Sequence, residues 1–94
     1  MSIHNGHRER LRQRFRKEGL TNFAPHEVLE LLLYYCIPRA DTNGIAHRLI
    51  QRYKTIGRVL QASEKELQMF EGIGENATFF LSLLNAANRH INVE

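Results

Sequence analysis

Hydrophobic residues recur along this chain at the three- and four-residue spacing of amphipathic helices. The spacing predicts helices over residues 8–18, 25–36, 44–53 and 55–62, then a short helix after Ser63 and a last helix that follows Gly74 and reaches Ile91. No stretch keeps the strict alternation of a half-buried strand, so we expect no sheet. The predicted fold is therefore all-α, a small bundle of five to six helices.

The stretch from Pro25 to Cys36 is apolar on almost every side. Proline suits the first position of a helix, and Pro38 ends the run because a proline does not continue one. A helix that is apolar all round is buried, so we expect this one at the centre of the bundle. Glu27 and Glu30 lie in its first half, where the helix dipole favours negative charge.

The N-terminal helix has a different pattern, because only Leu11 and Phe15 form a narrow apolar seam. The cations on the two sides of this seam are Arg8, Arg10, Arg12, Arg14, Arg16 and Lys17. Residues 1–24 hold six Lys and Arg against two Glu, whereas residues 25–94 hold seven against eight Asp and Glu. Two interpretations follow: a basic arm that lies along nucleic-acid phosphates, or a solvated helix that pairs with acidic residues of a partner. We expect residues 1–24 to form this basic helix and a linker, and residues 25–94 to form one globular unit.

A Gly-x-Gly turn separates the last two predicted helices. Gly72 and Gly74 lack a Cβ and tolerate positive φ, so the chain can turn sharply while Ile73 points into the junction between the helices. This pattern resembles the helix-hairpin-helix motif of DNA-repair and replication proteins. The resemblance implies that the amides of Gly72, Ile73 and Gly74, with Asn76 behind them, hold a DNA phosphate with little regard to base sequence.

Two carboxylates depart from the form of this motif that grips DNA. Such motifs often carry Lys, Arg or Thr just after the second glycine, whereas here Glu71 and Glu75 flank the turn. Glu75 stabilises the helix start through the dipole, but it also repels a phosphate at the same place. The hairpin is therefore either a structural element or a weak DNA contact that needs help elsewhere.

An earlier turn, from Arg39 to Gly44, resembles a degenerate first copy of the hairpin. Asp41 or Thr42 can cap the helix that follows it. Two such copies predict a tandem helix-hairpin-helix arrangement, which is a SAM-like fold. A second DNA contact would involve Arg39, Asn43 and the helix start at Gly44.

Nothing in the sequence points to catalysis. Its five histidines are scattered and no Cys pair or His-Glu-x-x-His spacing completes a metal site, so we expect no metal and no cofactor. The single cysteine, Cys36, lies in an apolar run typical of a buried, inert thiol. No apolar run approaches the roughly 20 residues of a membrane span and the first residues lack a signal-peptide pattern, so we expect a cytoplasmic protein with no membrane partner.

Longer blocks make the chain similar to the N-terminal domain of the RadC-like proteins, the UPF0758 family. The matching blocks are Gly6-His7-Arg8-x-Arg10-Leu11-Arg12-x-Arg14-Phe15, His26-Glu27-x-Leu29-Glu30-Leu31-Leu32-Leu33, Pro38-Arg39-x-Asp41-Thr42-Asn43, Ala46-x-x-Leu49, Ala62-Ser63-x-x-Glu66-Leu67 and Gly72-Ile73-Gly74. Members of that family usually continue into a JAB/MPN-type domain that resembles zinc-dependent isopeptidases and carries a His-x-His ligand pair. This sequence has no His-x-His, so the resemblance implies no hydrolase role for it, whether it is a fragment or a stand-alone domain.

The leading hypothesis is a non-catalytic, sequence-tolerant DNA-binding module of a RadC-like protein of the DNA-repair type. The rival hypothesis is a protein-interaction or oligomerisation domain that positions a JAB/MPN-type metal-hydrolase domain outside this chain. Glu71 and Glu75 beside the hairpin favour the rival, and the six cations of the N-terminal helix favour DNA.

Overall fold

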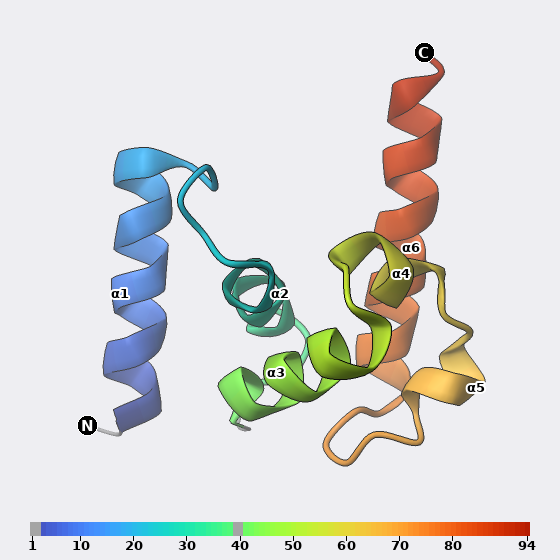
Figure 1. Cartoon of the computed structure of the whole chain (residues 1–94), viewed down its shortest axis with the longest axis horizontal. Coiled ribbons are helices and arrows are strands. Elements are labelled where there is room, and N and C mark those ends of the chain that lie inside the picture. The colour runs from blue at the N-terminus through green and yellow to red at the C-terminus, as the bar shows by residue number, and fades with distance from the viewer. Residues whose placement is uncertain (1–2, 39–40) are drawn as a thin grey trace.

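Helices make up all the regular structure in residues 3–38 and 41–94, the part of the chain that the computed structural model describes. The helices in this part are α1 (Ile3–Glu18), α2 (Pro25–Leu33), α3 (Thr42–Tyr53), α4 (Ile56–Gln61), α5 (Glu64–Leu67) and α6 (Glu75–Asn92). Figure 1 shows α1 on one side, α6 on the other, and α2 to α4 between them. The prediction of an all-α bundle is confirmed.

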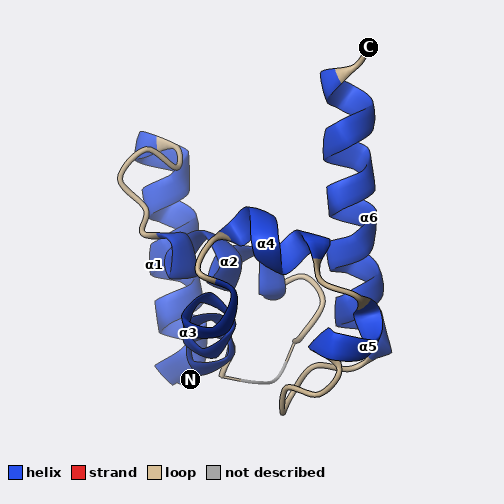
Figure 2. Cartoon of the chain, turned by 45° about the vertical axis from the view of Figure 1, so that its right-hand side comes forward, coloured by secondary structure: helices blue, strands red, loops and turns tan. Residues whose placement is uncertain are grey.

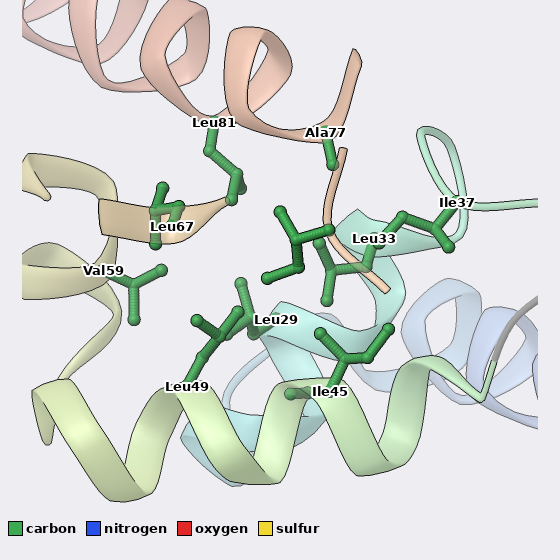
Figure 3. Packing of buried hydrophobic residues seen from close by; sticks show 11 residues of the cluster. Leu29, Leu33, Ile37, Ile45, Leu49, Val59, Leu67, Ala77 and Leu81 are labelled. Carbon is green, nitrogen blue, oxygen red and sulfur yellow. The ribbon is translucent and has the colours of Figure 1, made fainter. Parts of the chain in front are cut away.

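The main core gathers side chains from every helix except α1. Its buried members are Leu29, Leu33, Ile37, Ile45, Ala46, Leu49, Val59, Leu67, Ile73, Ala77 and Leu81. Leu29 and Leu33 of α2 are fully enclosed, and Figure 3 shows both among side chains from α3 and α6. The apolar α2 is therefore the central helix, as its sequence predicts.

Three helices begin at a side chain that accepts a hydrogen bond from the first turn. The three acceptors are Asp41 for α3, Thr55 for α4 and Ser63 for α5. The spacing Ser63-x-x-Glu66 predicts a capping box, in which each residue bonds the amide of the other, and Ser63 does accept from the amide of Glu66. The carboxylate of Glu66 does not reach the Ser63 amide: it lies 3.4 Å from the Ser63 hydroxyl and accepts from Tyr53.

Helix α2 is shorter than its apolar run. It ends at Leu33, whereas the sequence predicts a helix that reaches Cys36. Beyond Leu33 the backbone tightens, since the amides of Tyr35 and Cys36 bond carbonyls three residues back. The helix therefore ends in this tight turn, before the chain reaches Pro38.

Helix α6 extends past the rest of the molecule at its C-terminal end (Figures 1 and 2). Ala77 and Leu81 in its first half are buried, but Ile91 is 62% exposed. The helix therefore reaches Ile91, as its spacing predicts, but its end does not face the core. The apolar spacing continues there, but no helix lies beside it.

Helix α1 packs on α2 through a smaller, separate cluster. Leu11 is buried there with Phe23 and Tyr34. Phe15, the second residue of the predicted seam, is 46% exposed. The apolar contact that holds α1 is therefore even thinner than its sequence predicts.

Candidate nucleic-acid interface

The six cations of α1 divide into two groups. Arg10, Arg12, Arg16 and Lys17 are exposed. In the described part of the chain, Arg10, Arg16 and Lys17 have no ion-pair partner, and Arg12 has only a loose contact of 3.9 Å with Glu9. The two remaining cations, Arg8 and Arg14, are half-buried against α2 and the segments beside it.

Arg14 is bound to the start of α2. Its guanidinium donates to both carboxylate oxygens of Glu27, at 2.8 and 3.4 Å, and to the carbonyl of Asn22 at 3.2 Å. It also lies 4.3 Å from the centre of the Phe23 ring. The Arg14 guanidinium, and next the amide of Ala24, hold the pKa of Glu27 below its ordinary value of 4.5. Arg14 therefore attaches α1 to α2, and its side chain points away from the four exposed cations.

Arg8 lies at the other end of the same junction. Its guanidinium donates to the carbonyl of Ile37 at 3.0 Å and lies 4.5 Å from the centre of the Tyr34 ring. A cation over an aromatic face is a favourable contact. Two of the six cations predicted to contact DNA thus have a second role, which is to hold α1 in place.

A buried carboxylate joins α1, α2 and α3. Glu30 is only 1% exposed, and its oxygens accept from the hydroxyl of Tyr34 and the amide of Asn43, both at 3.0 Å. Nε2 of His7 lies 2.7 Å from the same carboxylate, but it is not aligned to donate to any group in the described residues. Burial, and next the bond to Glu30, raise the pKa of Tyr34. Sequence reasoning missed this cluster, although a Glu inside so apolar a helix was a signal for it.

Two residues of the first predicted hairpin, Asn43 and Gly44, are already hydrogen-bonded within the fold. The amide of Gly44 is already bound to Asp41 at 3.1 Å, and the side-chain amide of Asn43 is bound to Glu30. These two predicted site residues therefore have roles within the fold. The third, Arg39, lies outside the described residues.

The two glycines of the second hairpin are not equivalent. Gly72 has a φ of 90°, and a Cβ there would lie 2.8 Å from Cδ1 of Ile45. Gly74 has a φ of −107° and an extended backbone, and a Cβ there would meet nothing within 4 Å. Of the two glycines, only Gly72 therefore uses the positive φ that a glycine tolerates. Ile73 does point into the junction, where it is 6% exposed.

Some of the hairpin amides are already hydrogen-bonded within the fold, and others are not. The amide of Ile73 bonds the carbonyl of Phe70 at 3.2 Å, so it is not free for a phosphate. Gly74 gives α6 no side-chain cap, which leaves first-turn N–H groups without intrahelical acceptors. This helix start borders a depression of about 380 Å³, whose lining residues are Cys36, Ile37, Pro38, Gly72, Gly74, Glu75, Asn76 and Ala77.

Glu75 lines this depression, and Glu71 precedes its lining residue Gly72. Glu71 and Glu75 are both exposed beside it. One cation, Arg48 of α3, reaches the hairpin and donates to the carbonyl of Glu71 at 3.3 Å. Burial raises the pKa of the neighbouring Cys36 to about 11, so its thiol stays protonated at neutral pH.

The exposed cations and the hairpin lie far apart. Figure 1 shows α1 on one side of α2 and α3, and the turn between α5 and α6 on the other. The longest dimension of the molecule is 37 Å. The two predicted DNA contacts are therefore separate surfaces.

No helix in the described residues is long and apolar enough to cross a membrane. The same residues bring no three His, Cys, Asp or Glu side chains together in a group that could hold a metal ion.

These features define a small all-α domain in which a tight turn joins α5 to α6, with a basic helix attached at one side. A UPF0758 protein of Fusobacterium nucleatum subsp. nucleatum is 48% identical to the chain over 79 residues, which are 84% of this chain and 34% of that relative. The chain therefore belongs to the UPF0758, or RadC-like, family, and it spans about a third of the length of this curated relative. No protein-family model and no solved structure matches it.

Proposed function

We propose that this domain binds the phosphate backbone of DNA, with little regard to base sequence, through the exposed side of α1. The observation that carries the proposal is the group of four exposed cations on the two flanks of α1, Arg10, Arg12, Arg16 and Lys17, of which only Arg12 has an ion-pair contact within the described residues. Cations arranged in this way release counterions when they meet phosphates, which favours binding to any nucleic acid.

The polar side chains of α1 support sequence tolerance. Asn and Gln side chains read adenine, and Arg reads guanine, where they reach base edges, whereas an Arg bound to a phosphate carries no sequence information. Gln13 is the one amide side chain between Arg8 and Glu18. It donates to Glu9 at 2.7 Å, so its amide is engaged within the helix. The exposed groups that remain on this stretch are mostly cations, which suit phosphate contacts.

The second hairpin has a mainly structural role in this proposal. The fit of Gly72 against Ile45 and the burial of Ile73 tie the turn to the core. Glu71 and Glu75 would repel a phosphate at the start of α6, because their carboxylates are exposed beside it. Gly74 and Asn76 are left as a weak secondary contact.

The domain itself would be non-catalytic and would deliver DNA to the remainder of a longer RadC-like protein. This part of the proposal rests on family membership and on the length of the curated relative, of which the chain spans 34%. A JAB/MPN-type domain is the expected neighbour, and the cytoplasm is the expected location.

A second candidate function is protein interaction through α6. Apolar side chains are exposed along this helix and just after it, at Phe79, Leu83, Ile91 and Val93. An apolar surface of this kind suits a protein neighbour better than a phosphate backbone. It does not conflict with DNA binding at α1, because α6 lies on the opposite side of the molecule (Figure 1).

The test is fluorescence anisotropy of a labelled 16-base-pair duplex with the full chain, over a series of salt concentrations. Four phosphate contacts predict a slope of log K against log salt of roughly −3.6. The double variant Arg10→Glu/Lys17→Glu should weaken binding and make the slope shallower by about two.

The matched control is Arg58→Glu/Arg89→Glu, which makes the same change in net charge at exposed positions on α4 and α6. Equal weakening by both double variants would show only a net-charge effect and would contradict a site on α1. Absence of binding at low salt would refute the DNA proposal and leave the protein-interaction surface of α6 as the candidate.

A further inference from the structure

An apolar groove runs between α1 and α2, on the side away from the main core. It encloses about 420 Å³, and its walls and floor are Arg12, Phe15, Arg16, Leu20, Val28, Leu31, Leu32 and Tyr35. Three of these apolar side chains are well exposed: Phe15 at 46%, Leu20 at 43% and Tyr35 at 67%. Side chains of this size are normally buried, so their grouping around one groove indicates a binding surface.

The groove continues into a second hollow. The adjoining depression, of about 320 Å³, is lined by Arg8, Glu9, Arg12, Tyr34 and Tyr35. Arg12 and Tyr35 are common to the two hollows. An extended ligand could therefore pass from one hollow to the next over the Tyr35 ring.

The cations and aromatic rings at the groove together indicate which class of ligand it binds. Arg12 and Arg16 line the groove, and Arg10 and Lys17 lie on the same helix, so the surface attracts a polyanion. Exposed aromatic rings beside cations are the platform on which unpaired bases stack, since every base has an apolar face. A duplex hides those faces inside its own stack. The carboxylate of Glu9 lines the second hollow and would repel a polyanion there. It lies 3.9 Å from the guanidinium of Arg12, which offsets part of its charge.

We propose that the groove between α1 and α2 binds unpaired bases of single-stranded nucleic acid, with Phe15 and Tyr35 as stacking surfaces and Arg12 and Arg16 on the flanking phosphates. This inference rests on the proposed function of α1 and gives it a substrate class. It makes single-stranded or frayed DNA the preferred ligand and an intact duplex the weaker one.

The experiment compares a labelled 16-nucleotide oligo-dT with a 16-base-pair blunt duplex, by anisotropy at one moderate salt concentration. Wild type should bind oligo-dT more tightly than the duplex. Tyr35→Ala and Phe15→Ala should each raise the dissociation constant for oligo-dT about tenfold and leave duplex binding within about twofold. Tyr35→Phe keeps the ring and should bind as wild type does.

Phe79→Ala is the matched control. Phe79 is 60% exposed on α6, on the opposite side of the molecule from α1, so its loss should change neither dissociation constant. Phe15 and Tyr35 are exposed enough that each alanine variant should keep a cooperative thermal transition within a few degrees of wild type. Circular dichroism checks this before binding is compared.

Four outcomes separate this inference from the function on which it rests. Loss of oligo-dT binding in both ring variants, with duplex binding kept, supports it. If the Phe15 and Tyr35 variants bind both DNAs as tightly as wild type does, the inference is overturned, but the proposed DNA-binding function is not. No binding of either DNA by wild type removes both. A labelled amphipathic Glu/Leu helical peptide that binds through Tyr35 while oligo-dT does not would overturn it in favour of a protein ligand.

Discussion

The main core and the junction between α1 and α2 are held together by different kinds of contact. The main core contains eleven buried apolar residues from α2 to α6 and the turns between them. The junction buries only Leu11, Phe23 and Tyr34, and it adds the Arg14 to Glu27 ion pair, two cations over aromatic rings and the Glu30 cluster. The main core is stabilised mainly by removal of apolar surface from water, whereas the junction adds charged and polar contacts to a smaller apolar cluster.

This difference explains how α1 can be attached to α2 and still expose cations to a ligand. Arg8 and Arg14 face α2 and fix the orientation of α1, so the cations between and beyond them face outward. The same feature makes the attachment of α1 sensitive to pH and salt, whereas the main core is not expected to respond to either.

The largest expected effect is on the main core. Leu29→Ala should lower the free energy of unfolding by about 2–5 kcal/mol, because the side chain is fully enclosed and its loss leaves a cavity. Urea titration followed by circular dichroism measures it. The control Leu83→Ala, at an exposed position on α6, should stay within about 0.5 kcal/mol of wild type. Similar losses for the two variants would contradict the assignment of the core.

A smaller effect tests whether the second hairpin belongs to the main core. Gly72→Ala should cost about 1–3 kcal/mol, because it combines positive φ with a Cβ that collides with Ile45. Gly74→Ala should be nearly neutral, since its backbone is extended and the space around it is open. Equal thermal stability of the two variants would mean that the hairpin is not fitted against α3 in this way.

The smallest expected effect concerns the α1 junction and acid. Since the folded-state pKa of Glu27 lies below its ordinary value of 4.5, the ion pair contributes stability at pH above that value. The contribution is lost as the pH falls through the lowered pKa. The protection of α1 amides against hydrogen exchange should therefore fall as the pH drops below 4.5, while the main core stays protected. Glu27→Gln should already show looser α1 exchange at pH 7, and an acid response identical to wild type would rule out Glu27 as its source.

Local patterns predicted the helices and most of their starts, although α1 begins at Ile3 and not at residue 8. Proline at the start of α2 and polar caps at Asp41 and Ser63 act within one turn of backbone, so sequence spacing is enough to find them. The apolar pattern at the end of α6 did not predict its burial correctly, because periodicity does not say how far neighbouring helices extend. Ile91 is exposed for this reason.

The candidate site was less predictable because it depends on how helices are turned against one another. Helical spacing placed cations on both sides of the α1 seam, but it did not show that Arg8 and Arg14 would find partners on or beside α2. It also did not show that Asn43 would bind Glu30, or that only Gly72 of the two hairpin glycines would need positive φ. Each of these depends on a contact between residues far apart in sequence.

The most direct test of the account is an amide NMR titration of the full chain with a short DNA duplex at low salt. The account predicts shifts for the exposed side of α1, at Arg10, Arg16 and Lys17, with Gly74 and Asn76 at the hairpin nearly unchanged. Shifts confined to the start of α6, with α1 unaffected, would contradict it. They would place the DNA contact at the hairpin despite its carboxylates.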